Sequence, residues 1–233
     1  MAFADLLATV GHERGLIGPR EVPRLWDRHL LNCAAMTELL PLGARVVDVG
    51  SGAGLPGVVL AIRRPDLRVD LVESLQRRVQ FLEETVTELG LDESVRVVRG
   101  RAEERRVIDA VGSAQWVTAR AVAPLDRLVK WCLPLLEPGG TLLAMKGSSA
   151  AAEVLAHQAE IHRLGGTRLE TVQCGTEWAG EPVAVVVVHR GGAAGGSGKR
   201  SRSGKRSGTG EPSRPRERSR HERDGRVDGG RST

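Results

Sequence analysis

The segment that most constrains the fold of this chain is residues 46–57, Val-Val-Asp-Val-Gly-Ser-Gly-Ala-Gly-Leu-Pro-Gly. Its apolar start is typical of the end of a buried parallel strand, which the carboxylate of Asp48 interrupts. Three glycines then let the backbone turn sharply and approach a ligand closely: Gly50, Gly52 and Gly54. Residues 55–63 have the apolar content of a helix, and Pro56 suits its first turn. The segment predicts a strand, a turn and a helix around a nucleotide-type cofactor site.

The glycines of this segment do not identify the cofactor by themselves. A dinucleotide fingerprint G-x-G-x-x-G that starts at Gly50 fails at Leu55, whereas one that starts at Gly52 is completed by Gly57. The longer pattern D-x-G-x-G-x-G resembles motif I of Rossmann-like S-adenosylmethionine (SAM) methyltransferases. SAM carries no pyrophosphate, and its cationic sulfonium and amino-acid moiety favour a carboxylate near the turn. We therefore expect Asp48 and the three glycines to bind SAM, since an ordinary tight turn does not require this pattern.

The positive charge of the chain is concentrated at its C-terminal end. The chain has 34 Lys+Arg and 29 Asp+Glu, of which residues 191–233 hold 12 and 5, a net charge of +7. Residues 1–190 therefore have a net charge of −2, so any RNA surface there must be a local patch. The tail is rich in Gly, Ser and Arg, and we expect it to be disordered. Weak attraction to RNA phosphates and a dispensable solubilising role both fit its composition.

The remaining composition excludes several classes of protein. Three cysteines lie far apart without a C-x-x-C pair, which argues against a zinc site or a disulfide framework and predicts a reducing cytoplasm. The N-terminus lacks a basic region followed by a long apolar run, so we expect no secretory signal. The longest strongly apolar run, Val183 to Val188, is too short to span a bilayer. We expect no metal and no membrane partner, and we favour a monomer.

From Ala44 onward, short apolar runs alternate with amphipathic segments, which is typical of an α/β fold with a mostly parallel sheet flanked by helices. Strands are predicted at 45–49, 69–72, 95–98, 115–118, 141–145, 167–174 and 182–189. Helices are predicted at 3–10, 21–40, 55–63, 75–89, 125–136 and 149–163, with a loop at 11–20. The predicted parts are an N-terminal helical extension (1–43), a cofactor-binding domain (44–190) and the basic tail (191–233).

Five successive strands deliver candidate site residues at their carboxyl ends. These are Gly50, Glu73, Ala102-Glu103, Arg120 and Lys146. The carboxyl ends of parallel strands share one rim of an open α/β sheet, and ligands bind at that rim. Each residue alone has an ordinary structural explanation, but five at one edge favour a binding site.

Two of these positions suit an adenosine moiety. Glu73 lies 19 residues after Gly54, where an acidic residue can accept from ribose hydroxyls, although a helix-capping surface residue would fit as well. The N–H of Ala102 can donate to adenine N1, and a neighbouring carboxylate can accept from the exocyclic amine. Glu103 is the candidate carboxylate, and Glu104 beside it leaves the assignment open.

The predicted helix 21–40 carries an aromatic residue, a cation and a histidine close together, at Trp26, Arg28 and His29. Trp26 is expected to pack and Arg28 to lie on a solvated face. A lone histidine such as His29 is more often structural than catalytic. The predicted buried stripe consists of Leu25, Leu30, Leu31 and Ala34.

Five stretches together resemble one family. They are Trp-Asp-Arg-His-Leu-Leu-Asn (26–32), Val-Asp-Val-Gly-Ser-Gly-Ala-Gly-Leu-Pro-Gly (47–57), Arg-Arg-Val-Gln-Phe-Leu (77–82), Thr-Ala-Arg-Ala-Val-Ala (118–123) and Leu-Ala-Met-Lys-Gly (143–147). Over about residues 10–190 the chain is similar to the RsmG (GidB) family of bacterial small-subunit rRNA guanine-N7 methyltransferases. The Leu-Pro-Gly after the turn and the Arg-His-Leu of the upstream helix are more specific than the glycine pattern.

The resemblance implies a Rossmann-like SAM-dependent methyltransferase fold and a guanine of 16S rRNA as the substrate, in naked RNA or in the small subunit. It also implies that Glu73 contacts the ribose of SAM, where the family often has the shorter Asp. The other residues implied to contact SAM are Gly50, Leu55, Ala102-Glu103 and Arg120.

Guanine N7 carries an in-plane lone pair, so its methylation requires no general base. Alignment and electrostatics should then carry catalysis. We expect Arg120 and Lys146 to be catalytic at the junction of cofactor and guanine, where a cation can hold the base by O6. Arg28, His29 and Lys146 are expected to bind the RNA.

Three other functions remain open. The first is a SAM-dependent methyltransferase for a small molecule or a protein, which the family-like helix upstream of the turn disfavours. The second is a non-catalytic RNA-binding or assembly protein with a methyltransferase fold, which the intact turn and Glu73 disfavour. A nucleotide-dependent oxidoreductase that binds NAD rather than SAM is the weakest alternative.

Overall fold

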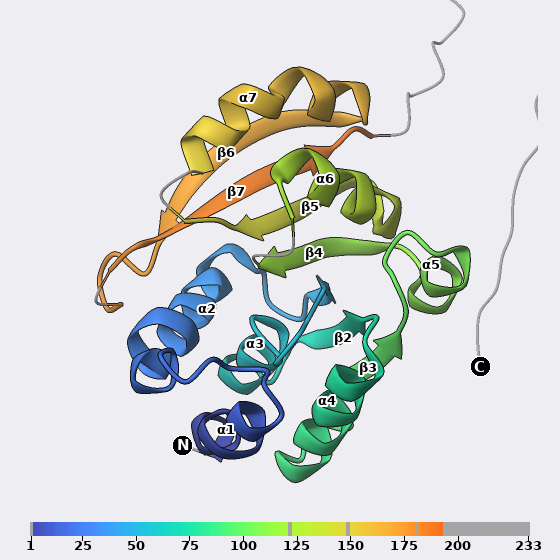
Figure 1. The fold of residues 1–233 in the computed structure, drawn as a ribbon. Coiled ribbons are helices and arrows are strands. Elements are labelled where there is room, and N and C mark those ends of the chain that lie inside the picture. The colour runs from blue at the N-terminus through green and yellow to red at the C-terminus, as the bar shows by residue number, and fades with distance from the viewer. Residues whose placement is uncertain (1, 121–122, 148–149, 180, 193–233) are drawn as a thin grey trace, which may run out of the picture. The chain divides into compact units, whose positions relative to one another are not determined.

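The computed structural model describes residues 2–120, 123–147, 150–179 and 181–192. These residues form one sheet with helices on both faces (Figure 1). From residue 193 onward, the predicted basic tail lies outside the described residues.

The sheet built by the described residues has seven strands in the order β3-β2-β1-β4-β5-β7-β6. Strands β1 to β5 run parallel, and β7 is antiparallel to its neighbours β5 and β6. The strand order reverses between β1 and β4, the point at which an open α/β sheet forms a crevice for ligands. The strands are β1 (Arg45–Val49), β2 (Arg68–Glu73), β3 (Val95–Arg99), β4 (Ala114–Arg120), β5 (Leu136–Met145), β6 (Gly166–Cys174) and β7 (Val183–Arg190).

The helices divide between the two faces of the sheet. One hydrophobic cluster joins helices α1 to α4 to the sheet, and a second cluster on the opposite face joins α5 to α7. Strands covered by helices on both sides must be apolar on both sides, which explains the valine-rich runs of the parallel β1 and of the antiparallel β7. The helices are α1 (Ala2–Leu6), α2 (Leu31–Ala35), α3 (Gly57–Arg63), α4 (Gln76–Glu88), α5 (Arg105–Val111), α6 (Leu125–Cys132) and α7 (Ala150–Arg163).

The seven predicted strands are confirmed, six with end shifts of at most two residues and β5 with a start five residues earlier, but the predicted positions of several helices need correction. The predicted loop at 11–20 starts inside helical structure, because α1 continues as a π-helical turn over Leu7–Gly11. The predicted helix 125–136 ends at Cys132 and is followed by a short 3-10 turn, and Leu136 already pairs with Ala114 in the sheet. Helix α5 was not predicted.

The helix predicted at 21–40 changes its type along its length. A 3-10 turn (Val22–Arg24) leads into a π-helical segment, η3 (Leu25–Leu30), then α2 and a final 3-10 turn (Met36–Leu39). The wider π turn brings residues five positions apart onto one face, so Leu25 and Leu30 are both buried. Trp26, which was expected to pack, is 47% exposed.

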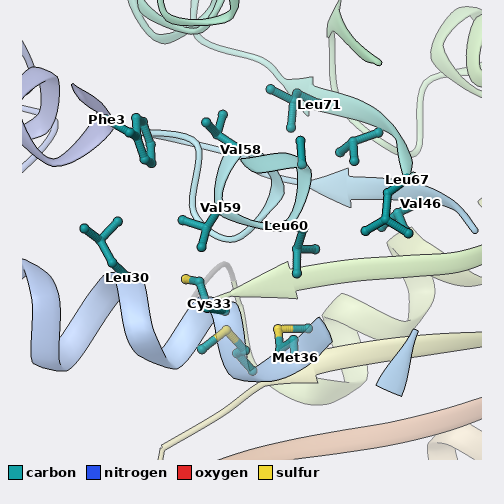
Figure 2. Packing of buried hydrophobic residues seen from close by; sticks show 14 of the residues in the cluster. Phe3, Leu30, Cys33, Met36, Val46, Val58, Val59, Leu60, Leu67 and Leu71 are labelled. Atoms are coloured by element: carbon teal, nitrogen blue, oxygen red, sulfur yellow. The ribbon is translucent and has the colours of Figure 1, made fainter. Parts of the chain in front are cut away.

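The N-terminal segment shares its core with the first βα unit. Figure 2 shows Leu30, Cys33 and Met36 directed toward α3, and Phe3 beside Val58. Residues 1–43 therefore pack against the sheet domain through an apolar contact, and the boundary at residue 44 stays a prediction.

The carboxylate of Asp48 is fully buried beneath the turn that follows β1. It accepts a hydrogen bond from the N–H of Gly57 at 3.1 Å and one from Thr118 Oγ1 of β4 at 3.0 Å. Ser51 Oγ donates to the Asp48 backbone carbonyl at 2.9 Å. One side chain thus joins the end of β1 to the start of α3 and to the neighbouring strand.

Gly57 must be glycine because α3 starts in close contact with β1 and β2. A Cβ at this position would lie 2.3 Å from Leu71 Cδ2 and 2.7 Å from Asp48 Oδ2, and both of those side chains are buried. We expect Gly57→Ala to lower the free energy of unfolding by about 1–3 kcal/mol, as overpacking of a core does. Denaturant unfolding measures this change. Gly18→Ala is the control, because a Cβ there meets nothing within 4 Å, and an equal loss in both variants would contradict the steric explanation.

Burial raises the pKa of Asp48 to about 6, despite the hydrogen bonds that it accepts. Because the folded state then binds this proton more tightly than the unfolded chain, Asp48 makes the protein less stable as pH rises from about 4 to 6. Asp48→Asn cannot titrate, and its altered hydrogen bonds add only a pH-independent change. The unfolding free energy of wild type minus that of Asp48→Asn should fall by about 2 kcal/mol between pH 4.5 and 7.5. A constant difference in urea titrations would contradict this prediction.

Candidate functional site

A cavity of about 570 Å³ opens at the carboxyl ends of β1, β2, β3 and β4. Its volume is in the range of pockets that hold small-molecule ligands. The N-terminal segment contributes Leu16, Ile17 and His29 to the wall, and α6 contributes Trp131. The wall of the cavity is therefore formed by the carboxyl ends of the four strands together with the N-terminal segment and α6.

The glycine turn forms one wall of the cavity with its backbone. Gly50 and Gly52 adopt φ values of 69° and 58°, a left-handed conformation that side chains disfavour. Gly54 does not line the cavity. A Cβ on Gly54 would lie 2.6 Å from Val58 Cγ2, so its role is to let α3 pack against the turn.

Glu73 lines the cavity at the end of β2, as predicted, and its side chain is only 4% exposed. Its Oε2 accepts from the N–H of Gly52 at 3.0 Å, and its Oε1 accepts from the N–H groups of Ser74 and Leu75 at 2.8 and 2.9 Å. Three backbone donors therefore fix the carboxylate. A carboxylate oxygen can accept more than one hydrogen bond, so Oε2 can also accept from a ligand hydroxyl.

The turn after β3 brings Ala102 and Glu103 to the cavity. Glu104 does not line it and instead pairs with Arg106 at 2.7 Å, so Glu103 stays the candidate carboxylate. Within the described residues, nothing accepts a hydrogen bond from the N–H of Ala102, which is buried. The next residue in the chain, Glu103, carries the carboxylate expected to accept from the adenine amine, and it lines the same cavity.

Arg120 reaches the cavity from the end of β4. Its Nη2 lies 2.6 Å from His29 Nδ1 and 3.4 Å from the carbonyl of Arg28, and its Nη1 lies 3.3 Å from Cys33 Sγ. In the part of the chain that the structure describes, no carboxylate forms an ion pair with Arg120. The guanidinium thus keeps its charge uncancelled at the cavity wall.

His29 lies between Arg120 and a carboxylate. Its Nε2 is 2.7 Å from Glu21 Oε2, and 13% of its side chain is exposed. Burial lowers the pKa of His29, the hydrogen bond to Glu21 opposes this, and the positive charge of Arg120 lowers it further. His29 therefore remains neutral at neutral pH.

Several predicted site residues lie outside the cavity. Lys146 is drawn away from it, because its Nζ donates to the Ala123 carbonyl at 2.7 Å and pairs with Glu153 at 2.9 Å. Strand β5 is also one position further from the switch point than β4. Asp48 lies beneath the turn rather than in the cavity, and Arg28 is exposed beside Glu21, 3.7 Å from its carboxylate. The structure thus joins four of the five predicted strand ends.

Leu55 lines the cavity as expected, but several other lining residues were missed. Arg78 Nη1 of α4 lies 3.6 Å from Glu73 Oε2, and Arg78 belongs to the family-like stretch 77–82, for which no site role is predicted. Trp131 is not among the buried residues of α6. A large aromatic residue outside the buried face of a helix could have indicated a ligand contact in the sequence. Leu16 and Ile17 lay in a predicted loop and gave no signal.

Two further observations concern the described residues only. They contain no cluster of three His, Cys, Asp or Glu side chains that could hold a metal ion. None of their helices combines the length and the apolarity needed to cross a membrane.

Relatives of known sequence match most of the chain. The family described as rRNA small subunit methyltransferase G (GidB) matches residues 1–181. The ribosomal RNA small subunit methyltransferase G of Salinispora arenicola is 61% identical over 197 residues, which cover 82% of this chain and 80% of the relative. That of Mycobacterium marinum is 54% identical over 193 residues, covering 83% and 84%.

Solved structures agree on the fold. The S-adenosylmethionine-dependent methyltransferase SibL has a TM-score of 0.56 at 20% identity, over 81% of this chain and 62% of that one. A predicted O-methyltransferase from Agrobacterium tumefaciens has a TM-score of 0.54 at 16% identity, over 70% and 81%. The predicted Rossmann-like methyltransferase fold is confirmed, and with a family match over residues 1–181 the chain belongs to the rRNA small subunit methyltransferase G family.

Proposed function

We propose that this protein transfers the methyl group of SAM to N7 of a guanine in 16S rRNA. One observation carries the proposal: the glycine turn, Glu73, Glu103 and Arg120 share the wall of one cavity at the switch point of the sheet. The family to which the chain belongs supplies the RNA substrate.

The residues of the cavity fit SAM. The turn over Gly50–Ala53 presents backbone to the ligand with no side chain at the two glycines. Glu73 can accept from the ribose hydroxyls, and the Ala102 N–H with the Glu103 carboxylate can pair with the adenine edge. When bound, SAM supplies an electrophilic methyl group carried by a sulfonium.

The chemistry requires orientation rather than proton transfer. Guanine N7 attacks with a lone pair that is already in the plane of the base. Arg120 donates to O6 on the same edge of the guanine and fixes the direction of N7. Because none of its described partners carries a negative charge, the guanidinium retains its full attraction for that oxygen. No residue acts as a general base.

The RNA side of the site is the rim formed by the N-terminal segment. Arg28 is exposed there, with 53% of its side chain accessible, and is suited to hold a phosphate. The target guanine must leave its stack to enter a cavity of this size, so a single-stranded or flipped base is the expected substrate. The cytoplasmic location and the monomeric state remain predictions.

The proposed activity is tested with small-subunit rRNA from a strain that lacks this gene, presented as naked RNA and as assembled subunits. We expect one new N7-methylguanosine in one 16S loop after incubation with labelled SAM, mapped by borohydride–aniline cleavage. SAM binding without transfer to either RNA would favour a small-molecule or protein substrate. A protein that binds RNA but no SAM would favour a non-catalytic assembly role.

Arg120→Ala should lower kcat/KM for methyl transfer by about 10²-fold, because the guanine is no longer held by O6 and a small misplacement of the reacting N7 has an effect of this size. The single-turnover rate at saturating SAM measures the loss, and calorimetry measures SAM affinity. Arg63→Ala is the matched control, because Arg63 is exposed at the end of α3 that points away from the turn. Wild-type kcat/KM in Arg120→Ala would remove Arg120 from the mechanism.

A further inference from the structure

Among the residues that the structure describes, the partners of Arg120 all come from the N-terminal segment. The Arg28 carbonyl and His29 belong to η3, and Cys33 belongs to α2. None of the three carries a negative charge: one is a peptide oxygen, one is a neutral imidazole, and burial raises the pKa of the Cys33 thiol to about 11. The segment therefore fixes the guanidinium without cancelling its charge.

The hydrogen-bond chain determines which nitrogen of His29 carries the proton. Arg120 can only donate, so Nδ1 of His29 must accept from it at 2.6 Å. The Glu21 carboxylate, whose pKa the hydrogen bond from His29 lowers, can only accept, so Nε2 must donate to it at 2.7 Å. Glu21 and Arg120 thus favour the same neutral tautomer, and the carboxylate fixes the ring with Nδ1 free to accept from Arg120. With the other tautomer, two donors would face each other.

We infer that Glu21 and His29 are positioning residues for Arg120: the carboxylate fixes the imidazole, and the imidazole holds the guanidinium at the cavity wall in the orientation that the reaction requires. This inference rests on the proposed function for the role of Arg120. It assigns His29 to the inner wall of the site rather than to the RNA surface. The reason is geometric, because both ring nitrogens are already engaged and little of the side chain is exposed.

The contacts from Glu21 through His29 to Arg120 predict that the activity depends on pH. The charged groups that act on His29 are Glu21, Arg28 of its own turn and Arg120 of β4. Protonation of His29 would remove the acceptor for Arg120 and place a second positive charge beside it. Activity should therefore fall on the acid side as His29 gains its proton. Without the carboxylate of Glu21 the imidazolium is less stable, so this fall should move to lower pH.

Variants at Glu21 test the positioning role. We expect Glu21→Ala to lower kcat about 10- to 100-fold, since a small misplacement of a reacting group has effects of this size. The KM for RNA should not rise, because Arg28 loses only its acidic neighbour. Glu21→Gln should recover most of the kcat, because its amide oxygen can still accept from Nε2, and its acid limb should lie at lower pH. Asp27→Ala is the control, as it removes an exposed carboxylate from η3 itself.

A variant at His29 separates its role as hydrogen-bond acceptor for Arg120 from its gain of a proton at low pH. In His29→Asn the side-chain oxygen can take the place of Nδ1 as acceptor, but it cannot be protonated at these pH values. This variant should keep kcat within a few-fold of wild type and lose the acid limb, whereas His29→Leu should lose activity as Glu21→Ala does. An acid limb that persists unchanged in His29→Asn would overturn the pH dependence, and equal kcat in the two His29 variants would overturn the acceptor role.

A spectroscopic readout keeps this inference apart from the proposed function. With ¹⁵N-labelled histidine, the nitrogen shifts of His29 report its tautomer in the protein without RNA or SAM, and His29→Asn assigns the signal among the six histidines. Wild type should show the Nε2–H form, because Nε2 donates to Glu21 and Nδ1 accepts from Arg120. In Glu21→Ala the Nε2–H group loses its charged acceptor, so the Nε2 shift should move toward that of a water-exposed N–H. An Nδ1–H form in wild type, or an unchanged Nε2 shift in a folded Glu21→Ala, would overturn the inference. If wild type methylates no rRNA, the proposed function fails, while these shifts still decide whether Glu21 holds His29.

Discussion

The buried carboxylate of Asp48 is the interaction on which the site depends. It receives the first N–H of α3 and the hydroxyl of Thr118, so it fixes the helix start, the end of β1 and the position of β4 with one group. Those three elements define the switch point where the cavity opens. The interaction has an energetic cost, since burial disfavours the charged form, and the same burial keeps water from competing for the two hydrogen bonds.

The carboxyl ends of the strands form the part of the site suited to a nucleoside. The N-terminal segment contributes the residues that hold Arg120. Backbone groups at the ends of β1 and β3, together with Glu73, are suited to a nucleoside. The two solved structures named above share this fold at 16% and 20% identity, so the fold alone does not select a substrate. His29 and the residues that hold Arg120 come instead from η3 and α2, where the rim faces the RNA in our proposal.

The sequence predicted the fold and most of the cavity because both depend on local patterns. Alternating apolar runs located the strands, and the rule that parallel strands share a rim placed Gly50, Glu73, Glu103 and Arg120 together. Lys146 followed the same rule and was misplaced, because the rule does not show that Glu153 would pair with it. The π-helical turn of η3 was also invisible, and with it the pairing of His29 with Glu21, eight residues away.

The few aromatic residues of the chain make tryptophan fluorescence a way to observe the cavity wall. The chain has no tyrosine and four tryptophans, and of these only Trp131 lies on the cavity wall that the structure describes. Trp26 and Trp178 are exposed, and Trp116 packs within the sheet domain. A chain that keeps Trp131 as its single fluorophore would therefore emit from one position beside the ligand. Its spectrum and quenching would follow occupancy of the cavity in real time, with no label attached.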